Sequence, residues 1–333
     1  MVFGIGPCVC VCKRNKLKQF CGITSSGIQS WVLFLNALAS LLHCAMFVWL
    51  LTTLLNLRAE DEDFGITKPL MQSITVWQKF DSSVFNKTCA EEETCIGTAN
   101  DGEFVILSKS VENGELTLEY LVLSFSFLSF VFQGLRPFVG LRTGGIVKDY
   151  LQEVKARVNW LRWVEYSFSA TCMILAISFV VDPNIEFSTV LMVSTSTWAT
   201  QMCGLVTEFM LEYTNDLAVP AWIIHLAGWV LQIGVFASIF NSYFKSTEFA
   251  ADDTLAVEPP AFVSYIVYGE AVLFGSFGLT AFLDILDRTL GINCCCRKNP
   301  ATGFELAYIG LSLTAKFFLS IVVAVNLWIN PES

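Results

Sequence analysis

Charged residues are scarce in this chain. Asp, Glu, Lys and Arg make up 15% of the 333 residues, whereas hydrophobic residues make up 54%. This balance excludes an ordinary soluble globular protein and indicates a polypeptide that crosses a membrane several times. Basic patches mixed with aromatic residues are also missing, so nucleic acid is not an expected partner.

The chain also lacks the motifs of common enzymes. It has no nucleophile, base and oxyanion arrangement, no phosphate-binding loop and no metal motif, and we therefore predict that it is not an enzyme. Cysteines beside basic residues before the first and last apolar runs lack the paired spacing of a zinc site, which favours S-acylation or free thiols. They are Cys8, Cys10, Cys12, Cys21, Cys294, Cys295 and Cys296. The first apolar run is too long for a cleavable signal peptide.

Seven apolar runs are long enough to cross a bilayer, which takes about 20 helical residues. They are Trp31–Leu55, Leu116–Leu135, Trp160–Val181, Ser188–Leu211, Ala221–Phe244, Pro260–Leu283 and Phe304–Ile329. Lys and Arg gather before the first run and in the links from second to third and from sixth to seventh, which places all three on the cytoplasmic side. The sequence thus predicts an all-α membrane protein with seven transmembrane helices, a cytoplasmic N-terminus and an extracellular C-terminus. The third helix is expected to start upstream, at about Val147.

Residues 56–115 form one long loop, which this orientation places outside the cell. The loop is acidic and carries a glycosylation sequon at Asn86. Its two cysteines, Cys89 and Cys95, suit a local disulfide in an oxidising compartment. The sequon and the acylation-prone cysteines favour the plasma membrane or an endomembrane of a eukaryote, or of its virus.

The same loop contains two β-rich runs, Ser73–Phe80 and Phe104–Val111, that are candidates for a small β-hairpin. The predicted organisation has three parts. A cytoplasmic Cys-rich basic tail covers residues 1–28, the seven-helix domain with its long loop covers residues 29–330, and an extracellular tail covers residues 331–333.

The last apolar run has a single lysine, Lys316, near its middle. A bare ammonium at that depth costs at least about 2.5–3.5 kcal/mol, and it lies too far from either helix end to reach water easily. Two interpretations stay open. Lys316 is either half of a structural ion pair in the membrane or a reactive amine that carries a carbonyl cofactor as a Schiff base.

Polar residues from four helices are expected at one depth, in the cytoplasmic half of the bilayer. A rise of about 1.5 Å per residue from the outer helix ends puts one group roughly 18 to 24 Å deep, namely Lys316, Glu165, Ser169, His43 and Ser129. Ser312 and Gln133 lie one turn deeper. Glu165 is the natural counter-ion of Lys316, because each charge offsets the burial of the other. Arg162, one turn away on the same helix face, is predicted to hold Glu165 ionised.

Two motifs carry a family resemblance: RWVEYSFSA at residues 162–170 and SLTAK at residues 312–316 are similar to those of heliorhodopsins. These are seven-helix photoreceptors with a cytoplasmic N-terminus, and an algal or viral member is the best match. The resemblance implies that Lys316 binds all-trans retinal as a protonated Schiff base with Glu165 as counter-ion, and it suggests a homodimer. It also places three polar residues near the Schiff base: Ser169, Ser312 and His43.

One position departs from that family. Where its second helix has a histidine four residues after a serine, this chain has Ser129 followed by Gln133, and glutamine does not titrate. Proton acceptance by two histidines is therefore not expected, and the remaining histidine, His225, is interpreted as a packing residue. Spacing and resemblance together give the large apolar residues expected along the polyene, which are Met173, Met202, Phe274 and Phe277.

Glu270 is the charge that these assignments leave unexplained. It lies ten residues after Pro260, roughly 15 Å below the outer boundary, where an unpaired carboxylate is costly and is a candidate functional group. Some viral heliorhodopsins pass protons through a sixth-helix glutamate, which implies that role for Glu270. The alternative is a protonated Glu270 bonded to a neighbour such as Tyr268. Four other acidic residues at inner helix ends are expected to be solvated: Glu208, Glu212, Asp284 and Asp287.

Three functions therefore stay open. They are a retinal photosensor that signals through its cytoplasmic loops, a light-activated proton transporter or channel, and a seven-helix transporter unrelated to retinal. Pigment formation with retinal separates the third from the others, and a photocurrent separates the first two. The sequence names no signalling partner.

Overall fold

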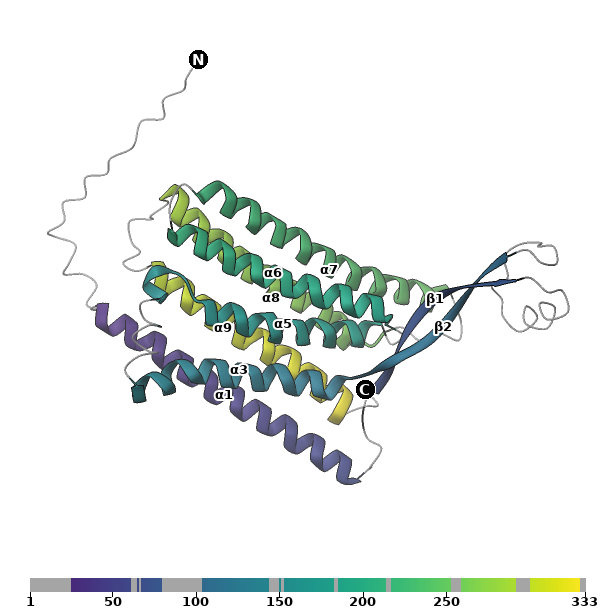
Figure 1. Ribbon diagram of the computed structural model, residues 1–333. Coiled ribbons are helices and arrows are strands. Elements are labelled where there is room, and N and C mark those ends of the chain that lie inside the picture. Colours follow the sequence, from purple (N-terminus) through teal and green to yellow (C-terminus); the bar gives the residue numbers. More distant parts are fainter. Residues whose placement is uncertain are drawn as a thin grey trace, which may run out of the picture.

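The computed structural model describes residues 25–60, 65, 67–79, 104–143, 150, 153–182, 185–213, 217–252, 259–291 and 300–329. Long helices lie side by side in one bundle, and a two-stranded hairpin projects from one end (Figure 1). We call this the hairpin end and the other the opposite end. Several predicted features lie outside the described residues, namely Asn86, Cys89, Cys95, Cys294–Cys296 and the cysteines of the N-terminal tail.

The helices coincide with the predicted apolar runs, although the second and sixth runs start one or two residues before their helix. Such runs form helices because a helix satisfies its backbone hydrogen bonds internally, as the interior of a membrane requires. The bounds are α1 (Ser25–Glu60), α3 (Leu118–Thr143), α5 (Trp160–Val181), α6 (Phe187–Tyr213), α7 (Ala218–Asp252), α8 (Ala261–Leu290) and α9 (Pro300–Val323), which continues as the π-helical segment η3 (Ala324–Ile329).

Six of these helices, searched over the described residues, are long and apolar enough to cross a membrane: α1, α3, α5, α7, α8 and α9 with η3. The protein is therefore an integral, multi-pass membrane protein. The helix α6 is not among the six, and its sequence is rich in Ser and Thr, several of which bond to carbonyls one turn earlier, as Thr200 does to Ser196.

The helix α5 does not begin upstream as predicted. Arg157 has a φ of 60°, which a right-handed helix does not accommodate, and the chain turns there. Asn159 then caps α5, because its side-chain oxygen accepts a hydrogen bond from the backbone N–H of Arg162 at 3.1 Å. Tyr150, seven residues before this turn, is buried.

The predicted β-hairpin is confirmed, and it is longer than expected. Strand β1 (Thr67–Lys79) pairs antiparallel with β2 (Phe104–Thr117). The register opposes Ser73 to Ser110 and shifts once, between Pro69 and Met71, because β2 carries one extra residue there. Gly114 lies in this bulge with a φ of 131°, which glycine adopts readily. The strand β2 runs directly into α3, so the hairpin is continuous with the bundle (Figure 1).

The apolar core occupies the hairpin-end half of the bundle, and α5 lies at its centre. The helix α5 packs against α3, α6, α7 and α8, and its Ile174 and Ile177 are fully buried. Leu50, Phe125 and Leu319 meet them from other helices. The buried residues of the opposite half are largely polar, so the two ends of one bundle differ in chemistry.

Candidate functional site

Lys316 and Glu165 form a buried ion pair, as the sequence predicts. Lys316 Nζ lies 2.8 Å from Glu165 Oε1, and both side chains are almost completely buried. Ser129 of α3 donates a hydrogen bond to the same carboxylate oxygen at 2.9 Å and also contacts Lys316 Nζ. Three helices thus hold one ammonium, one carboxylate and one hydroxyl together, which offsets the cost of burying either charge alone.

A cavity opens beside this ion pair, between α5, α6, α7, α8 and α9. Including its mouth it encloses about 820 Å³, and Lys316 is part of its wall. The hydroxyls of Ser169 and Ser312 line it too, and neither has a hydrogen-bond partner among the described residues. Much of the remaining wall is apolar and aromatic, although Gln201, His225 and Gln232 also line it. The site therefore has the form of a small-molecule pocket, mostly apolar with a few polar groups.

The predicted apolar lining is right at three positions and wrong at one. Met173, Phe274 and Phe277 line the cavity, but Met202 does not, because its neighbours Gln201 and Cys203 occupy that wall of α6. Successive residues of a helix point about 100° apart, so spacing along the helix axis does not fix which of them faces inward.

The two histidines and Gln133 also lie inside the bundle. His43 is buried, its ring lies edge-on to Phe317 with centroids 5.6 Å apart, and neither ring nitrogen has a hydrogen-bond partner in the described part of the chain. Gln133 is buried, and its side-chain oxygen likewise has no such partner. His225 lines the cavity, where Trp229 Nε1 donates to its Nε2 at 3.0 Å, in keeping with a packing role.

The prediction that Arg162 holds Glu165 ionised is wrong. Arg162 pairs with Glu305 at 2.5 Å and, at short range, with Glu208. Its side chain leans toward the N-terminal end of α5, as helical side chains do, and therefore away from Glu165. The arginine near Glu165 is Arg136 of α3, whose Nη2 lies 4.0 Å from Glu165 Oε2. The sequence placed Arg136 in a basic link, yet it is buried.

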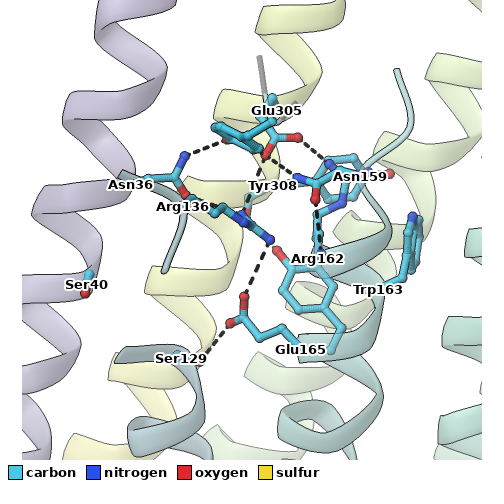
Figure 2. Close-up of polar contacts among 12 residues, drawn as sticks. Asn36, Ser40, Ser129, Arg136, Asn159, Arg162, Trp163, Glu165, Glu305 and Tyr308 are labelled. Carbon is cyan, nitrogen blue, oxygen red and sulfur yellow. Dashed lines mark hydrogen bonds and ion pairs between the residues drawn. The ribbon is translucent and has the colours of Figure 1, made fainter. Parts of the chain in front are cut away.

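Glu305 is the centre of a polar network that the sequence analysis missed (Figure 2). Besides Arg162, it accepts hydrogen bonds from Tyr150 Oη at 3.0 Å and from Asn159 Nδ2 at 2.7 Å. Arg136 Nη1 lies 3.8 Å from it. A signal was present, since Glu305 stands eleven residues before Lys316, which is three helical turns on the same face.

Tyr150 extends this network toward α1. Its hydroxyl accepts a hydrogen bond from Asn36 Nδ2 at 2.7 Å and donates to Glu305. Burial, and then the negative charge of Glu305, raise the pKa of Tyr150 well above its usual value, so the hydroxyl keeps its proton as a donor. Arg136 in turn donates to Asn36 Oδ1 at 3.3 Å, which closes a ring of contacts between α1, α3 and α9.

Three of the acidic residues expected to be solvated are paired instead. Glu208 is buried and accepts from the backbone N–H of Asn159 at 3.0 Å as well as from Arg162. Asp284 and Asp287 both pair with Arg157, at 3.1 and 2.6 Å. Only Glu212 of the four is exposed, as predicted. These positions near helix ends are thus paired rather than solvated, because Arg157 at the break before α5 and Arg162 within it lie close to them.

Glu270 of α8 stays unexplained by pairing. It is 0% exposed, and neither of its carboxyl oxygens has a hydrogen-bond partner among the residues that the structure describes. The expected bond to Tyr268 is not formed, since Tyr268 points outward and is 48% exposed. Gly269 next to it packs against the ring of Phe318, two residues after Lys316, so α8 and α9 lie close together here.

The sequence model of the Heliorhodopsin family matches residues 74–327, which is well over half of the chain. The chain belongs to the heliorhodopsin family. No curated protein matches it. Membership indicates a light-sensing membrane protein with a retinal chromophore, and the matched segment contains Lys316, Glu165 and most of the cavity wall. His43 lies on α1, outside the matched segment of this heliorhodopsin.

Proposed function

We propose that this heliorhodopsin is a light-activated photoreceptor in which Lys316 carries all-trans retinal as a protonated Schiff base and Glu165 is the counter-ion. The observation that supports it is that Lys316, which lines the cavity, pairs with Glu165 at 2.8 Å. Bound retinal supplies the visible absorption and the light-driven isomerisation. The chain supplies the amine, a compensating charge and a largely apolar pocket.

The residues around the cavity suit this ligand. Met173, Phe274 and Phe277 offer an apolar wall for a polyene, and Ser169 and Ser312 offer hydroxyls beside the amine. Both hydroxyls lack a partner among the described residues, so each is free to bond to a group in the cavity. Ser129 holds the carboxylate from the side of α3 and keeps Glu165 oriented toward Lys316.

The topology is part of the proposal. We infer that α6 is the seventh crossing, because it packs between α5 and α7, both of which meet the criteria for spanning. Basic residues near the opposite end then place that end, with the N-terminus, in the cytoplasm. The hairpin lies outside, and the sensor signals through its cytoplasmic loops as a homodimer.

Reconstitution with all-trans retinal tests the assignment. The wild-type protein is expected to form a visible pigment, and Lys316→Ala is expected to form none. Lys155→Ala is the matched control, because Lys155 is exposed. Glu165→Gln should shift the absorption maximum to longer wavelength, since a neutral partner no longer stabilises the charge on the lysine nitrogen. A wild-type protein without pigment, or a pigmented Lys316→Ala protein, would overturn the proposal.

Glu270 favours a second function, light-activated proton transport. A fully buried carboxyl group with no partner in the described residues costs stability, and such groups in membranes commonly serve ion pathways. In this proposal Glu270 exchanges protons between the neighbourhood of Lys316 and the hairpin end of the bundle. The chain would then be a transporter or channel as well as a sensor.

Whole-cell patch clamp under illumination at two external pH values separates the two functions. A photocurrent whose reversal potential follows the proton gradient, and that is lost in Glu270→Gln, supports transport. Glu248→Gln is the control, because Glu248 is exposed near the same end of the bundle. Pigment without current leaves a purely sensory photoreceptor, and an undiminished current in Glu270→Gln removes Glu270 from the path.

A further inference from the structure

Arg136 occupies an unusual place between two carboxylates. Its guanidinium lies 4.0 Å from Glu165 and 3.8 Å from Glu305, and Figure 2 shows it between them. Neither distance is a hydrogen bond, and its Nε and Nη2 have no hydrogen-bond partner in the described part of the chain. Its hydrogen bond is to Asn36, at 3.3 Å. Arg162, by contrast, is held tightly by Glu208 and Glu305.

The charges around Arg136 balance as a set. Lys316, Arg136 and Arg162 oppose Glu165, Glu208 and Glu305, and all six side chains are buried. The other titratable groups that interact with them are His43 of α1 and Cys172 of α5, both near Lys316, and Tyr150, Tyr166 and Tyr308. Arg288 and Asp284 of α8 act on the set from beside Glu208 and Tyr308. If a proton binds a Glu165 oxygen, an O–H bond forms and that carboxylate becomes neutral. Among the described residues, Glu305 is then the one charged carboxylate left within 4 Å of Arg136.

We propose that Arg136 is a positioning residue that is shared between the two carboxylates and moves from Glu165 toward Glu305 when Glu165 is neutralised. The inference rests on the proposed role of Glu165 as counter-ion. A movement of Arg136 would change two of its contacts, because its guanidinium lies over the ring of Tyr150 at 5.5 Å and donates a hydrogen bond to Asn36. Tyr150 lies between α3 and α5 in the sequence, so a change of charge beside Lys316 is transmitted to a buried residue outside the helices that hold the ion pair.

Acid titration of the pigment's visible absorption tests this inference. Protonation of Glu165 shifts the absorption to longer wavelength, so the midpoint of that shift reports how well its negative charge is stabilised. Arg136→Gln removes a nearby cation and should move the midpoint up by about one pH unit, which is tenfold in proton affinity. Arg136→Lys should restore at least half of the difference.

Glu305→Gln should move the midpoint in the other direction, to lower pH, because Arg136 then has Glu165 as its remaining partner. In the double variant with Arg136→Gln, the effect of Glu305→Gln should vanish, since it acts through the arginine. Arg157→Gln is the control. Arg157 pairs with Asp284 and Asp287 at the same end of the bundle, and the titration midpoint of this variant should stay at the wild-type value.

The inference would be overturned if the titration midpoint of Glu305→Gln is unchanged or higher than that of the wild type. It would also be overturned if the midpoint shifts of Arg136→Gln and Glu305→Gln are additive in the double variant. If Arg136→Gln forms no pigment, the sign of the shift in Glu305→Gln and the midpoint of Arg136→Lys still decide it. Failure of the proposed function looks different, because the wild-type protein would then form no pigment and give no titration at all.

Discussion

Each end of the bundle buries a carboxylate, but the two carboxylates have opposite surroundings. At the opposite end, Glu305 has two arginines, a tyrosine and an asparagine around it. Toward the hairpin end, Glu270 lies among apolar side chains with no partner in the described residues. Paired charges of the first kind hold helices in place, whereas a lone carboxyl group adds no stability. The contrast is between a carboxylate that joins several helices and one that no described side chain stabilises.

Removing Glu305 should have the largest effect. Glu305→Leu leaves Arg162 with Glu208 alone and deprives Tyr150 and Asn159 of their acceptor, so the free energy of unfolding should fall by about 3–5 kcal/mol. Reversible unfolding in mixed detergent micelles measures it. Glu305→Gln keeps an acceptor oxygen and should lose less. A Glu305→Leu protein as stable as wild type would show that the network does not hold the helices together.

The cavity between the two ends depends on close packing at Gly204. An added Cβ there would overlap the ring of Trp163, a cavity-lining residue. Gly204→Ala should therefore cost about 1–3 kcal/mol and lower the yield of pigment. Gly234→Ala is the control, because nothing lies within 4 Å of its added Cβ, and it should be neutral or slightly stabilising. Equal pigment yields in the two variants would contradict this account of the cavity.

Removing the lone carboxyl group should change stability little. Glu270→Leu replaces an unpartnered polar group by an apolar one, so unfolding should stay at the wild-type value or rise by about 1 kcal/mol or less. The same detergent unfolding assay measures it. A loss comparable to that of Glu305→Leu would mean that Glu270 is structural, and the contrast between the two ends would fail.

The smallest effect is expected at the surface of α6. Glu212 is exposed and Glu208 is buried, one turn apart on the same helix. Glu212→Gln should change the free energy of unfolding by less than about 0.5 kcal/mol, whereas Glu208→Gln weakens the pair with Arg162 and should cost clearly more. Parallel unfolding curves check the difference. Equal effects would show that burial at this end does not govern stability.

The depth of the central ion pair could be predicted from the sequence, because the depth of a residue depends only on its own helix. Counting residues from the helix ends placed Lys316, Glu165 and Ser129 at one level, and their side chains are in contact. The rise of a helix is constant, so depth follows directly from residue number. The predicted pairing of the β-rich runs was right for a similar reason, since alternation along each strand is a local property.

The partner of each buried charge could not be predicted from its depth. Arg162 shares a helix face with Glu165, yet it reaches Glu208 and Glu305. Arg136 directly follows the second apolar run, which predicts a basic link residue, yet it lies inside the bundle between two carboxylates. A long side chain has several places within reach, and which of them holds a partner depends on helices distant in sequence.

Composition, local motifs and the fixed rise of a helix are enough to predict a helical, membrane-embedded chain, the family it resembles and the polar groups that share a depth. Which groups pair depends instead on how the helices assemble. Arg136 rather than Arg162 lies near Glu165, Met202 does not line the cavity, and Glu305 contacts two arginines, a tyrosine and an asparagine. Those outcomes depend on the rotation of neighbouring helices and on the turn at Arg157, which no single segment encodes.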